Sequence, residues 1–453
     1  MIGAPPSPAA TVRLRSWIDD PPHPSPGGPL LRVRGWCFDE GGAPITGIRA
    51  RVNGRLTVGC HGWRRPDVQA AFDGPPASAE SGFGLALRLT PGINRVRLEA
   101  ERPGRGWAEF RRWEVATPWS GYLAHRLRLA RFRLGTLLGR PAAAGGLTAA
   151  ERAWVLAEID QAGGHPLRLC PHHPPRPVEP ERFPAARLPR ARLPGVTIVT
   201  PSYQHANYLE ATLRSVLGQE GVRLDYIVQD GGSTDGSAEV LRRYGPRLKR
   251  WASEPDQGQA DAIRRGFAGL EAGPDDVMAY VNSDDQLMPG AVRFVAEYFA
   301  RHPGVDAVYG HRVLVDAAGQ EVGRWFAPRR ACDNLRLHDL VPQETLFWRK
   351  RIWDRVGGID PSFHFALDWD LLLRFEDAGA RIVRLPWFLG LFRIHPQQKS
   401  QAHLEQVGIP EMDRLRVRSL GRQPAPAELA ASMERAQIDS TILRTCLRHG
   451  WRL

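Results

Sequence analysis

Alternation of apolar and polar residues marks the first quarter of the chain as β-rich. Residues 12–116 contain short stretches of period two, separated by glycine, proline and Asn-Gly turns. Such stretches predict strands that bury one face and expose the other. Four of them are Leu31–Trp36, Ile48–Val52, Leu85–Leu89 and Val96–Ala100. We therefore expect an all-β sandwich domain over residues 12–116.

From residue 195 the pattern changes to short apolar runs that alternate with amphipathic segments. Val196–Thr200 is a β-branched run, and residues 209–217 place leucine and valine on one helical face, with Asn207 as a candidate cap and Gly218 as a stop. Alternating strands and helices predict a doubly wound, mostly parallel α/β sheet. Further strands are expected at 226–228, near 251 and at 277–281, with helices from about Ser237 and about Gln259.

Residues 117–194 connect the two patterns. Tyr122–Leu138 combines leucines near helical spacing with several arginines, which indicates either a basic helix on an anionic membrane or a helix packed between domains with its arginines reaching solvent. Residues 164–195 are rich in proline, arginine and histidine, a composition that disfavours helix and ladder hydrogen bonds. We expect a linker there, in which His172 and His173 are linker residues rather than a metal site.

The α/β pattern ends near residue 402. Residues 403–453 place apolar side chains near helical spacing, which predicts a helical tail that packs back on the α/β domain. These residues are Leu429, Met433, Ile438, Ile442 and Leu443.

Composition sets limits without naming a function. A length of 453 residues predicts two or three domains, and 42% hydrophobic with 24% charged residues is typical of globular proteins. The net charge of +12 favours acidic partners such as phosphates, nucleotides or anionic membrane without choosing among them. The five cysteines lack metal or redox spacing, and neither a signal sequence nor an apolar span is evident. We expect a soluble protein of the reducing cytoplasm.

Four acidic segments follow expected strands or begin expected helices: Asp230–Asp235, Glu254–Gly258, Asn282–Asp285 and Leu367–Asp370. Any one of them alone is ordinary turn composition. Open α/β sheets, however, bind ligands at the carboxyl ends of their strands, so acidic loops repeated there predict one cleft for a metal ion and a polar, phosphorylated substrate. No glycine-rich phosphate loop follows the first strand, where Pro201–Gln204 stands instead.

Taken in order, these segments resemble family 2 glycosyltransferases, which are inverting enzymes with the GT-A fold that use nucleotide-diphosphate sugars. The resemblance covers residues 195–402, which we expect to form the catalytic domain. The matching segments are Thr200–Tyr203, Asp230–Asp235, Asp256–Gly258 with Asp261–Ala262, Asn282–Asp285 with Pro289–Gly290, Gly357–Asp360 with Asp368–Asp370, and Leu391–Ser400.

The resemblance implies roles for individual residues. Asp368 becomes the catalytic base, Asp230 the nucleobase contact and Asp284 the ligand of a divalent cation, Mg²⁺ or Mn²⁺. His395 is a further candidate for the metal, and Lys399 is a candidate for the diphosphate. The implied donor site comprises Pro201, Ser202, Tyr203, Asp230, Asp256, Gly258, Asp261, Asn282, Ser283 and Asp284.

Three positions depart from the family pattern. Asn282 replaces the first aspartate of the usual DXD motif, which removes a charge from the metal site but keeps a hydrogen-bonding group. Leu367 replaces the glutamate that often precedes the base, and Arg264 replaces an asparagine. The first departure bears on metal affinity more than on fold. Asp370, two residues after the implied base, is expected to support the start of a helix.

The implied activity is inverting transfer of a sugar from a nucleotide-diphosphate sugar to a hydroxyl of a saccharide or lipid-linked acceptor, in the synthesis of cell-surface polysaccharide. Peripheral contact with the inner face of the cell membrane is expected, and a nucleic-acid partner is not. Two other functions stay open. A sugar nucleotidyltransferase needs a glycine-rich, cationic first loop, and a noncatalytic saccharide-binding protein with a decayed site is at odds with the presence of Asp230, Asp284, Asp285 and Asp368.

The β domain resembles small β domains found ahead of some glycosyltransferases, through Gly35–Phe38 and Arg65–Val68. Its Trp36 and Trp63 are either core residues or platforms for a sugar ring. The core is favoured, because burying a tryptophan removes a large area from water. The sequence identifies neither the donor sugar nor the acceptor.

Overall fold

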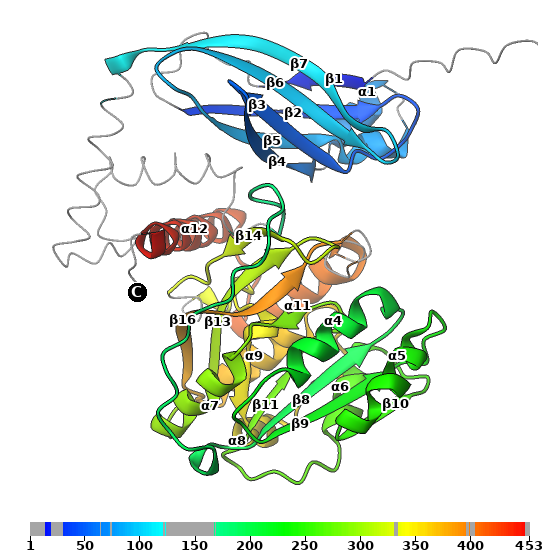
Figure 1. Cartoon of the computed structure of the whole chain (residues 1–453), viewed down its shortest axis with the longest axis vertical. Coiled ribbons are helices and arrows are strands. Elements are labelled where there is room, and N and C mark those ends of the chain that lie inside the picture. Colours follow the sequence, from blue (N-terminus) through cyan, green and yellow to red (C-terminus); the bar gives the residue numbers. More distant parts are fainter. Residues whose placement is uncertain are drawn as a thin grey trace, which may run out of the picture. The chain divides into compact units, whose positions relative to one another are not determined.

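Figure 1 shows the computed structural model of the chain, which divides into two compact units, Met1–Pro174 and Pro175–Leu453. Each unit encloses its own hydrophobic core. The structure describes residues 14–19, 30–63, 65–72, 75–120, 169–329, 334–395 and 404–448, together with residues 123, 167 and 398.

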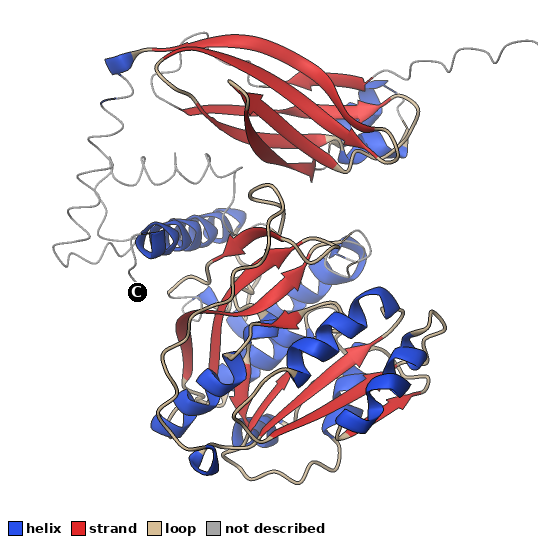
Figure 2. Ribbon diagram, in the orientation of Figure 1, coloured by secondary structure: helices blue, strands red, loops and turns tan. Residues whose placement is uncertain are grey.

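The first unit contains an antiparallel β domain (Figure 2), whose strands follow the order β1-β2-β5-β4-β3-β6-β7. β4 joins the two halves of this sheet, because its first residues pair with β3 and its last residues pair with β5. The strands are β1 (Leu14–Ile18), β2 (Leu30–Asp39), β3 (Gly47–Val52), β4 (Arg55–Trp63), β5 (Gly82–Arg88), β6 (Gly92–Arg102) and β7 (Gly106–Thr117), and α1 (Pro66–Phe72) and η1 (Pro76–Glu80) follow β4.

Side chains from both halves of this sheet meet in one core. Val33, Phe83, Leu85 and Leu98 are at most 3% exposed. Along β6 the buried residues alternate with exposed ones, as the period-two pattern predicts. The four strands expected from the alternation are therefore present. The independent folding of this domain as a sandwich stays a prediction.

Trp36 is a core residue of this unit. It is 8% exposed, and its ring packs against those of Phe38 and Phe72, with centroids 5.7 and 5.1 Å away. Val68 of α1 belongs to the same cluster. The Trp36 ring is therefore not available to stack on a sugar. The side chain of Trp63 lies outside the described part of the structure.

The second unit is built on a mixed sheet with the order β10-β9-β8-β11-β15-β13-β16-β12, and β14 pairs with β13. The first four of these strands run parallel, whereas β15 is antiparallel to both β11 and β13. The strands are β8 (Val196–Ser202), β9 (Leu224–Asp230), β10 (Arg250–Ser253), β11 (Val277–Tyr280), β12 (Gln286–Leu287), β13 (Ala307–Val315), β14 (Glu321–Trp325), β15 (Phe347–Arg349) and β16 (Ile382–Arg393).

Helices alternate with these strands as the sequence predicts. The cap assigned to Asn207 is wrong, because α4 begins at Ala206 and the Ala206 N–H donates to Asp235 Oδ2 at 2.8 Å. The cap comes from a distant loop rather than from the helix itself. The helices are α4 (Ala206–Leu217), α5 (Ser237–Tyr244), α6 (Gln259–Phe267), α7 (Ala291–Arg301), α8 (Lys350–Val356), α9 (Leu367–Asp377), α11 (Ile409–Leu420) and α12 (Pro426–Arg448).

Residues 175–194, which the composition suggests are linker, belong to the second unit. The Phe183 ring stacks on Phe294 of α7 with centroids 4.9 Å apart. The backbone N–H groups of Arg187 and Leu188 donate to the Glu297 carboxylate. These contacts hold the segment along α7 without a regular ladder. At the other end of the unit, α12 buries the apolar residues Ile438, Ile442 and Leu443.

Cysteine pairing differs from the sequence-based expectation. Cys37 is a free, buried thiol, and burial followed by the charge of Asp39 raises its pKa to about 12. Cys170 is disulfide-bonded. The scattered cysteines gave no sign of this bond, because pairing depends on distance in the fold rather than on spacing in the chain.

The basic segment Tyr122–Leu138 lies outside the described residues, except for Leu123. Among the helices that are described, none has the length and apolar character of a membrane span. Contact of the basic segment with a membrane stays a prediction.

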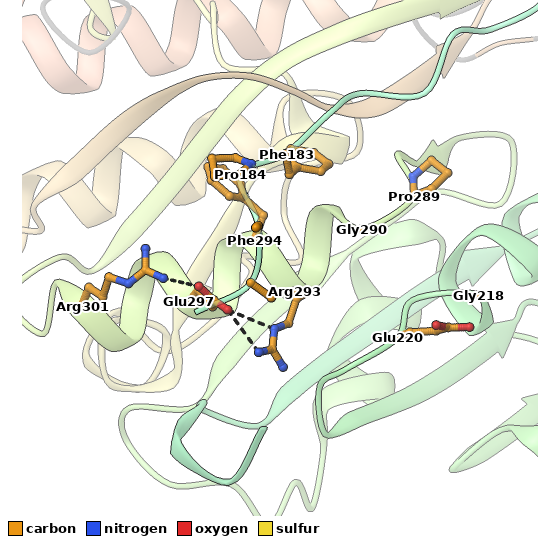
Figure 3. Close-up of a pocket in the computed structure, with 12 residues that line it drawn as sticks. Phe183, Pro184, Gly218, Glu220, Pro289, Gly290, Arg293, Phe294, Glu297 and Arg301 are labelled. Atoms are coloured by element: carbon orange, nitrogen blue, oxygen red, sulfur yellow. Dashed lines mark hydrogen bonds and ion pairs between the residues drawn. The ribbon is translucent and has the colours of Figure 1, made fainter. Parts of the chain in front are cut away.

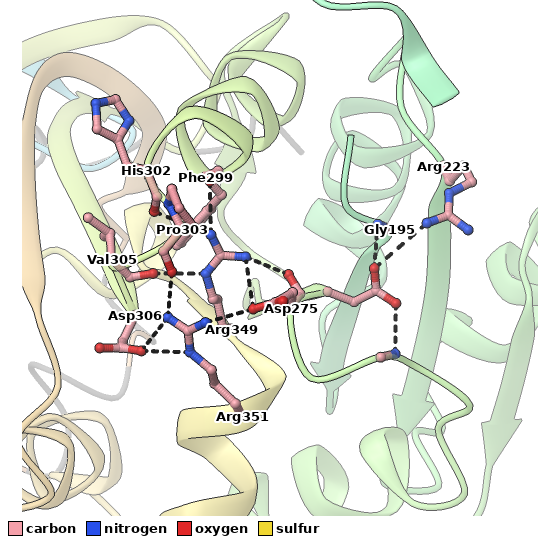
Figure 4. Close-up of polar contacts among 12 residues, drawn as sticks. Gly195, Arg223, Asp275, Phe299, His302, Pro303, Val305, Asp306, Arg349 and Arg351 are labelled. Atoms are coloured by element: carbon pink, nitrogen blue, oxygen red, sulfur yellow. Dashed lines mark hydrogen bonds and ion pairs between the residues drawn. The ribbon is translucent and has the colours of Figure 1, made fainter. Parts of the chain in front are cut away.

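Arg349, at the end of β15, binds backbone carbonyl groups from the end of α7 and from the loops before β11 and β13 (Figure 4). Its guanidinium donates to the carbonyls of Val305, Phe299 and Asp275 at 2.9, 2.8 and 2.9 Å. Arg349 is 3% exposed, so these bonds form away from water. Beside it, Arg351 is more exposed and pairs with Asp275 at 2.7 Å.

We predict that Arg349→Met lowers the free energy of unfolding by about 3 kcal/mol or more, because several buried carbonyls lose their donor together. Arg351→Met is the matched control and should cost about 1 kcal/mol or less, since its side chain is partly hydrated. Urea denaturation of the full chain measures both. Equal effects of the two substitutions would contradict this role for Arg349.

Candidate active site

The candidate site lies at the carboxyl edge of the parallel strands. β10, β9, β8 and β11 run in one direction, so the loops that follow them leave the same edge of the sheet. Three of the acidic segments are on these loops, and the fourth begins α9. The fold therefore collects segments that are far apart in the sequence.

Arg393 fastens the loop after β11 to the end of β16. Its backbone N–H donates to Asp285 Oδ1 at 3.0 Å, and its Nε donates to the Asp284 carbonyl at 3.0 Å. Its Nη1 donates to the carbonyls of Asp316 and Ala317, between β13 and β14. Arg393 is 4% exposed, so these bonds hold the loop firmly.

His205, Asp284 and His395 form a cluster of side chains that could hold a metal ion. Their candidate ligand atoms all lie within 4.8 Å of one another. The distance from His395 Nε2 to Asp284 Oδ2 is 3.1 Å. Two ligands that bind one octahedral ion at about 2.1 Å are about 3 Å apart, so this spacing fits a shared cation.

The surroundings of both imidazoles suit metal binding. His205 Nδ1 lies 2.8 Å from Ser283 Oγ, and a proton on Nδ1 leaves Nε2 free as a ligand. His395 is 2% exposed, and its Nδ1 has no hydrogen-bond partner in the described part of the chain. Burial lowers the pKa of His205 against the opposing charge of Asp284. The neutral imidazole, which is the form that binds metal, therefore predominates near neutral pH.

The adjacent carboxyls of Asp284 and Asp285 have opposite electrostatic environments. Burial alone would raise the pKa of Asp284, but the hydrogen bond from His395 and the charges of both histidines outweigh it and lower that pKa. Burial, followed by the charge of Asp284, raises the pKa of Asp285 well above its ordinary value. Asp284 is thus the charged carboxylate of the cluster, and Asp285 supports the loop through Arg393.

Asn282, the departure from the usual DXD motif, is held by two glutamines. Its Oδ1 accepts from Gln259 Nε2 at 2.7 Å, and its Nδ2 donates to Gln343 Oε1 at 3.2 Å. Gln343 begins η5 (Gln343–Thr345) and also donates to the Tyr280 carbonyl at 2.8 Å. The Asn282 side chain is therefore fixed in place without a charge.

Asp230 is fully buried, and the protein itself satisfies its carboxylate. Oδ1 accepts from Ser233 Oγ at 2.6 Å, and Oδ2 accepts from the Ser233 N–H at 2.9 Å and from Ser253 Oγ at 2.7 Å. These bonds tie the loop after β9 to the end of β10. A direct contact between Asp230 and a nucleobase stays a prediction, and the contacts present make Asp230 a clamp between two loops.

Asp256 lies against the loop after β9. A Cβ atom at Gly231 would be 3.0 Å from the Asp256 carboxylate, so a larger residue there would push Asp256 aside. Asp256 accepts from the Gly258 N–H at 2.8 Å, and Gly258 has a φ of 105°, which also favours glycine. Asp261 pairs with Arg265 at 2.7 Å and so supports the first turns of α6.

Pro201, Ser202 and Tyr203 are at the end of β8 and just beyond it. The first two are buried, and the Ser202 hydroxyl has no hydrogen-bond partner among the described residues. Tyr203 is 61% exposed. The next residue, Gln204, has a φ of 54°, and its N–H donates to Ser233 Oγ at 2.7 Å. The loop therefore presents an exposed aromatic ring beside the clamp around Asp230.

Asp368 is the second residue of α9 and is partly exposed. Its Oδ1 accepts from the Trp369 N–H at 3.0 Å. Asp370 is fully buried and pairs with Arg374 and Arg418, both at 2.6 Å. Of the two carboxylates, Asp368 is the accessible one, and Asp370 supports the helix.

Tyr280, the last residue of β11, links Asp368 electrostatically to the acidic loop. It is 1% exposed, and burial followed by the charges of Asp368, Asp339 and Asp285 raises its pKa well above the ordinary value. Carboxylates from the start of α9 and from the loop after β11 therefore act on the same tyrosine. The start of α9 and the loop after β11 therefore both lie near Tyr280.

Sequence reasoning missed His205, Gln259 and Gln343. His205 directly follows the Pro201–Gln204 segment, so a histidine beside a strand-end loop was the only available signal. The two glutamines gave no signal, because their relation to Asn282 exists only in the fold. Lys399, the candidate for the diphosphate, lies outside the described residues.

A pocket of about 460 Å³ lies elsewhere on this unit (Figure 3). Phe183, Pro184, Pro289, Arg293 and Phe294 are among its lining residues. None of the expected site residues lines it. We therefore do not assign it to the candidate active site.

Comparison with known proteins supports a single class. Residues 197–356 match the family model described as Glycosyl transferase family 2. The chain is 30% identical over 209 residues to the O-antigen biosynthesis protein RfbC of Myxococcus xanthus, covering 45% of this chain and 16% of that protein. It is 28% identical over 192 residues to a chondroitin synthase of Pasteurella multocida, covering 42% and 19%, respectively. The chain is also 28% identical over 183 residues to an uncharacterized glycosyltransferase of Mycobacterium tuberculosis, covering 40% of this chain and 68% of that protein.

Two solved structures are similar at low identity. Staphylococcus aureus TarS 1-349 in complex with UDP-GlcNAc gives a TM-score of 0.40 at 15% identity, covering 53% of this chain and 70% of that one. The mannosyltransferase PcManGT of Pyrobaculum calidifontis, in complex with GDP-Man and Mn²⁺, gives a TM-score of 0.41 at 16% identity, covering 62% of this chain and 78% of that one.

The α/β unit carries its acidic loops at the carboxyl edge of its sheet, and its residues 197–356 match glycosyltransferase family 2. The family resemblance deduced from the acidic segments is confirmed.

We predict that Mn²⁺ binds weakly to the protein alone and more tightly when a nucleoside diphosphate supplies further oxygen ligands. His205→Ala should weaken Mn²⁺ binding by at least about tenfold, because one of few protein ligands is lost. His302→Ala is the matched control, since His302 is exposed and lies outside the cluster. Electron paramagnetic resonance of free Mn²⁺ measures the affinity directly. Unchanged affinity in His205→Ala would exclude His205 as a ligand.

Proposed function

We propose that this protein transfers a sugar from a nucleotide-diphosphate sugar to a hydroxyl of a saccharide or lipid-linked acceptor, with inversion at the anomeric carbon. The observation that carries the proposal is the combination of a His205–Asp284–His395 cluster with a separate, accessible carboxylate, Asp368, in the first turn of α9. One group suits the phosphates of the donor, and the other suits the hydroxyl of the acceptor.

The cluster supports a divalent cation as cofactor. Two imidazoles and one carboxylate favour a transition-metal ion such as Mn²⁺ over Mg²⁺, which prefers oxygen ligands and gives up water reluctantly. A bound cation would offset the negative charge that develops on the departing diphosphate. His205 thereby supplies a ligand where Asn282 has removed the charge of the usual aspartate.

Asp368 supports the proton transfer. The attacking hydroxyl must lose its proton as it bonds to the anomeric carbon, and a positioned carboxylate accelerates such a step by about 10²- to 10⁴-fold. Asp368 keeps part of its side chain in contact with solvent, whereas Asp370 is committed to Arg374 and Arg418. A direct attack from the face opposite the diphosphate inverts the anomeric configuration.

Other strand-end residues suit the donor. Tyr203 presents an exposed ring that can stack on a base, and Asp256 lies against Gly231 in the loop held by Asp230. Asn282 keeps an amide, held by Gln259 and Gln343, that suits a sugar hydroxyl. These assignments leave Asp230 with the task of holding the loops that carry the contacts.

The acceptor class is proposed from the relatives, which include an O-antigen biosynthesis protein and a chondroitin synthase. Both names describe long extracellular saccharides, so we propose a role in the synthesis of a cell-surface polysaccharide. Of the two alternative functions, the sugar nucleotidyltransferase is not favoured, because Pro201 and Tyr203 stand where a cationic phosphate loop would be needed. The decayed-site alternative is not favoured either, since His205 and Asp284 form an assembled cluster.

We predict that Asp368→Asn lowers turnover by about 10²-fold or more while donor affinity changes little, because the base acts on the acceptor side. A panel of UDP-, GDP- and dTDP-sugars identifies the donor that the wild type hydrolyses, and kcat is then measured with that donor. Calorimetry with the corresponding nucleoside diphosphate gives the affinity. Asp370→Asn should instead lower stability, so near-normal kcat in Asp368→Asn would remove Asp368 as the base.

We predict that Asp230→Ala raises the donor KM more than it lowers kcat. The substitution releases Ser233 and Ser253 and loosens two loops that carry donor contacts, which weakens ground-state and transition-state binding alike. Ser253→Ala removes only one of these bonds and should give a smaller effect of the same kind. A loss confined to kcat would contradict the donor role of this clamp.

A further inference from the structure

The helix that carries Asp368 is capped by a residue from the C-terminal tail. Ala366, the cap position of α9, provides no side-chain hydrogen bond to the helix. Instead, the Glu411 carboxylate accepts from the N–H groups of His364, Phe365 and Ala366 at 2.7, 2.8 and 2.8 Å. Three consecutive backbone donors directly ahead of the helix thus converge on one carboxylate, an arrangement typical of anion binding at a helix N-terminus.

Glu411 also lies in the first turn of its own helix, α11. Its charge therefore lies near the positive ends of two helix dipoles, those of α9 and α11. The residue is 9% exposed, so its bonds are largely shielded from water. Hydrogen bonds from backbone donors to a charged acceptor are stronger than neutral ones, and three of them strongly limit the positions of residues 364–366.

Further contacts of α11 bracket Asp368 on both sides. Arg414 donates to Ser362 Oγ at 2.7 Å, and its guanidinium lies 4.0 Å from the centre of the Phe363 ring. Arg418 pairs with Asp370 at 2.6 Å. The tail helix therefore contacts the chain immediately before and immediately after Asp368.

We propose that Glu411 is a positioning residue for the sugar transfer, which fixes the start of α9 so that Asp368 meets the acceptor hydroxyl. This inference rests on the proposed function, because it takes Asp368 as the base. Glu411 lies beyond the residues that match the family model, 197–356. The C-terminal tail is then part of the catalytic apparatus rather than a separate appendage.

The expected effect follows from geometry. Asp368 is two residues after Ala366, so a shift of the capped loop moves the carboxylate directly. A misplacement of about 1 Å at a reacting group can cost about 10²-fold in rate. The proposed donor contacts are on the loops after β8 to β11, whereas the Glu411 carboxylate bonds to residues 364–366. Turnover should therefore fall while donor affinity stays.

The experiment compares Glu411→Ala, Glu411→Gln and Glu428→Ala in the full chain. Glu428 is the matched control, since it lies in the same tail and its carboxylate pairs with Arg422. We expect Glu411→Ala to lower kcat for hydrolysis of the preferred nucleotide sugar by about 10- to 100-fold, with affinity for the nucleoside diphosphate within about twofold of wild type. Glu411→Gln, which keeps the shape but loses the charge, should be intermediate, and Glu428→Ala should behave as wild type.

Hydrogen–deuterium exchange separates positioning from a general loss of structure. In Glu411→Ala, exchange should accelerate in residues 362–370 and stay unchanged in β8 and β11. If Glu411→Ala keeps wild-type kcat while Asp368→Asn loses it, the positioning role is wrong and the proposed function stands. If both variants keep wild-type kcat, the proposed function fails and this inference fails with it. Parallel loss of kcat and nucleotide affinity in both Glu411 variants would assign Glu411 to general stability and overturn the proposal.

Discussion

Arg393 makes the attachment on which the candidate site depends. Its backbone and side chain bind Asp284 and Asp285, and its guanidinium reaches the turn after β13, so one buried residue joins the acidic loop to two further strands. This attachment brings His395, two residues later, within 3.1 Å of Asp284. Without it, His205 would still bond to Ser283 of the acidic loop, but nothing would fix His395 beside Asp284 to complete the cluster.

Two of the acidic segments combine a partly exposed carboxylate with a buried one that supports the structure. Asp284 and Asp368 keep part of their side chains exposed, whereas Asp285 and Asp370 are buried and bound by arginines. A carboxylate whose oxygens are occupied by internal donors and shielded from solvent is less available to a substrate or a metal ion. The buried members instead hold the backbone that presents the exposed ones. Asp230 belongs to the buried group, so its proposed role in donor binding is to hold two loops together.

Capping by distant carboxylates is a recurring device in the second unit. Asp235 caps α4, and Glu411 binds the donors that precede α9. Because neither helix depends on a cap from its own N-cap side chain, the start of each is fixed by tertiary structure. Both helices begin next to site residues, His205 and Asp368, so the same bonds that complete a helix also orient the chemistry. The bonds of Glu411 thus link the C-terminal tail physically to the helix that carries Asp368.

The sequence by itself determined the alternating elements, because side-chain periodicity is a local property of the chain. The GT-A class and the candidates Asp284 and Asp368 followed from the resemblance of its acidic segments to a known family. The sequence could not find His205 as a partner of Asp284 or Glu411 as the cap of α9. It also misassigned the cap of α4 and gave no sign of the Cys170 disulfide. Each of these depends on distances between segments far apart in the chain. Only the packing of the sheet, its loops and the tail decided which carboxylates stay accessible and which are used to hold the structure.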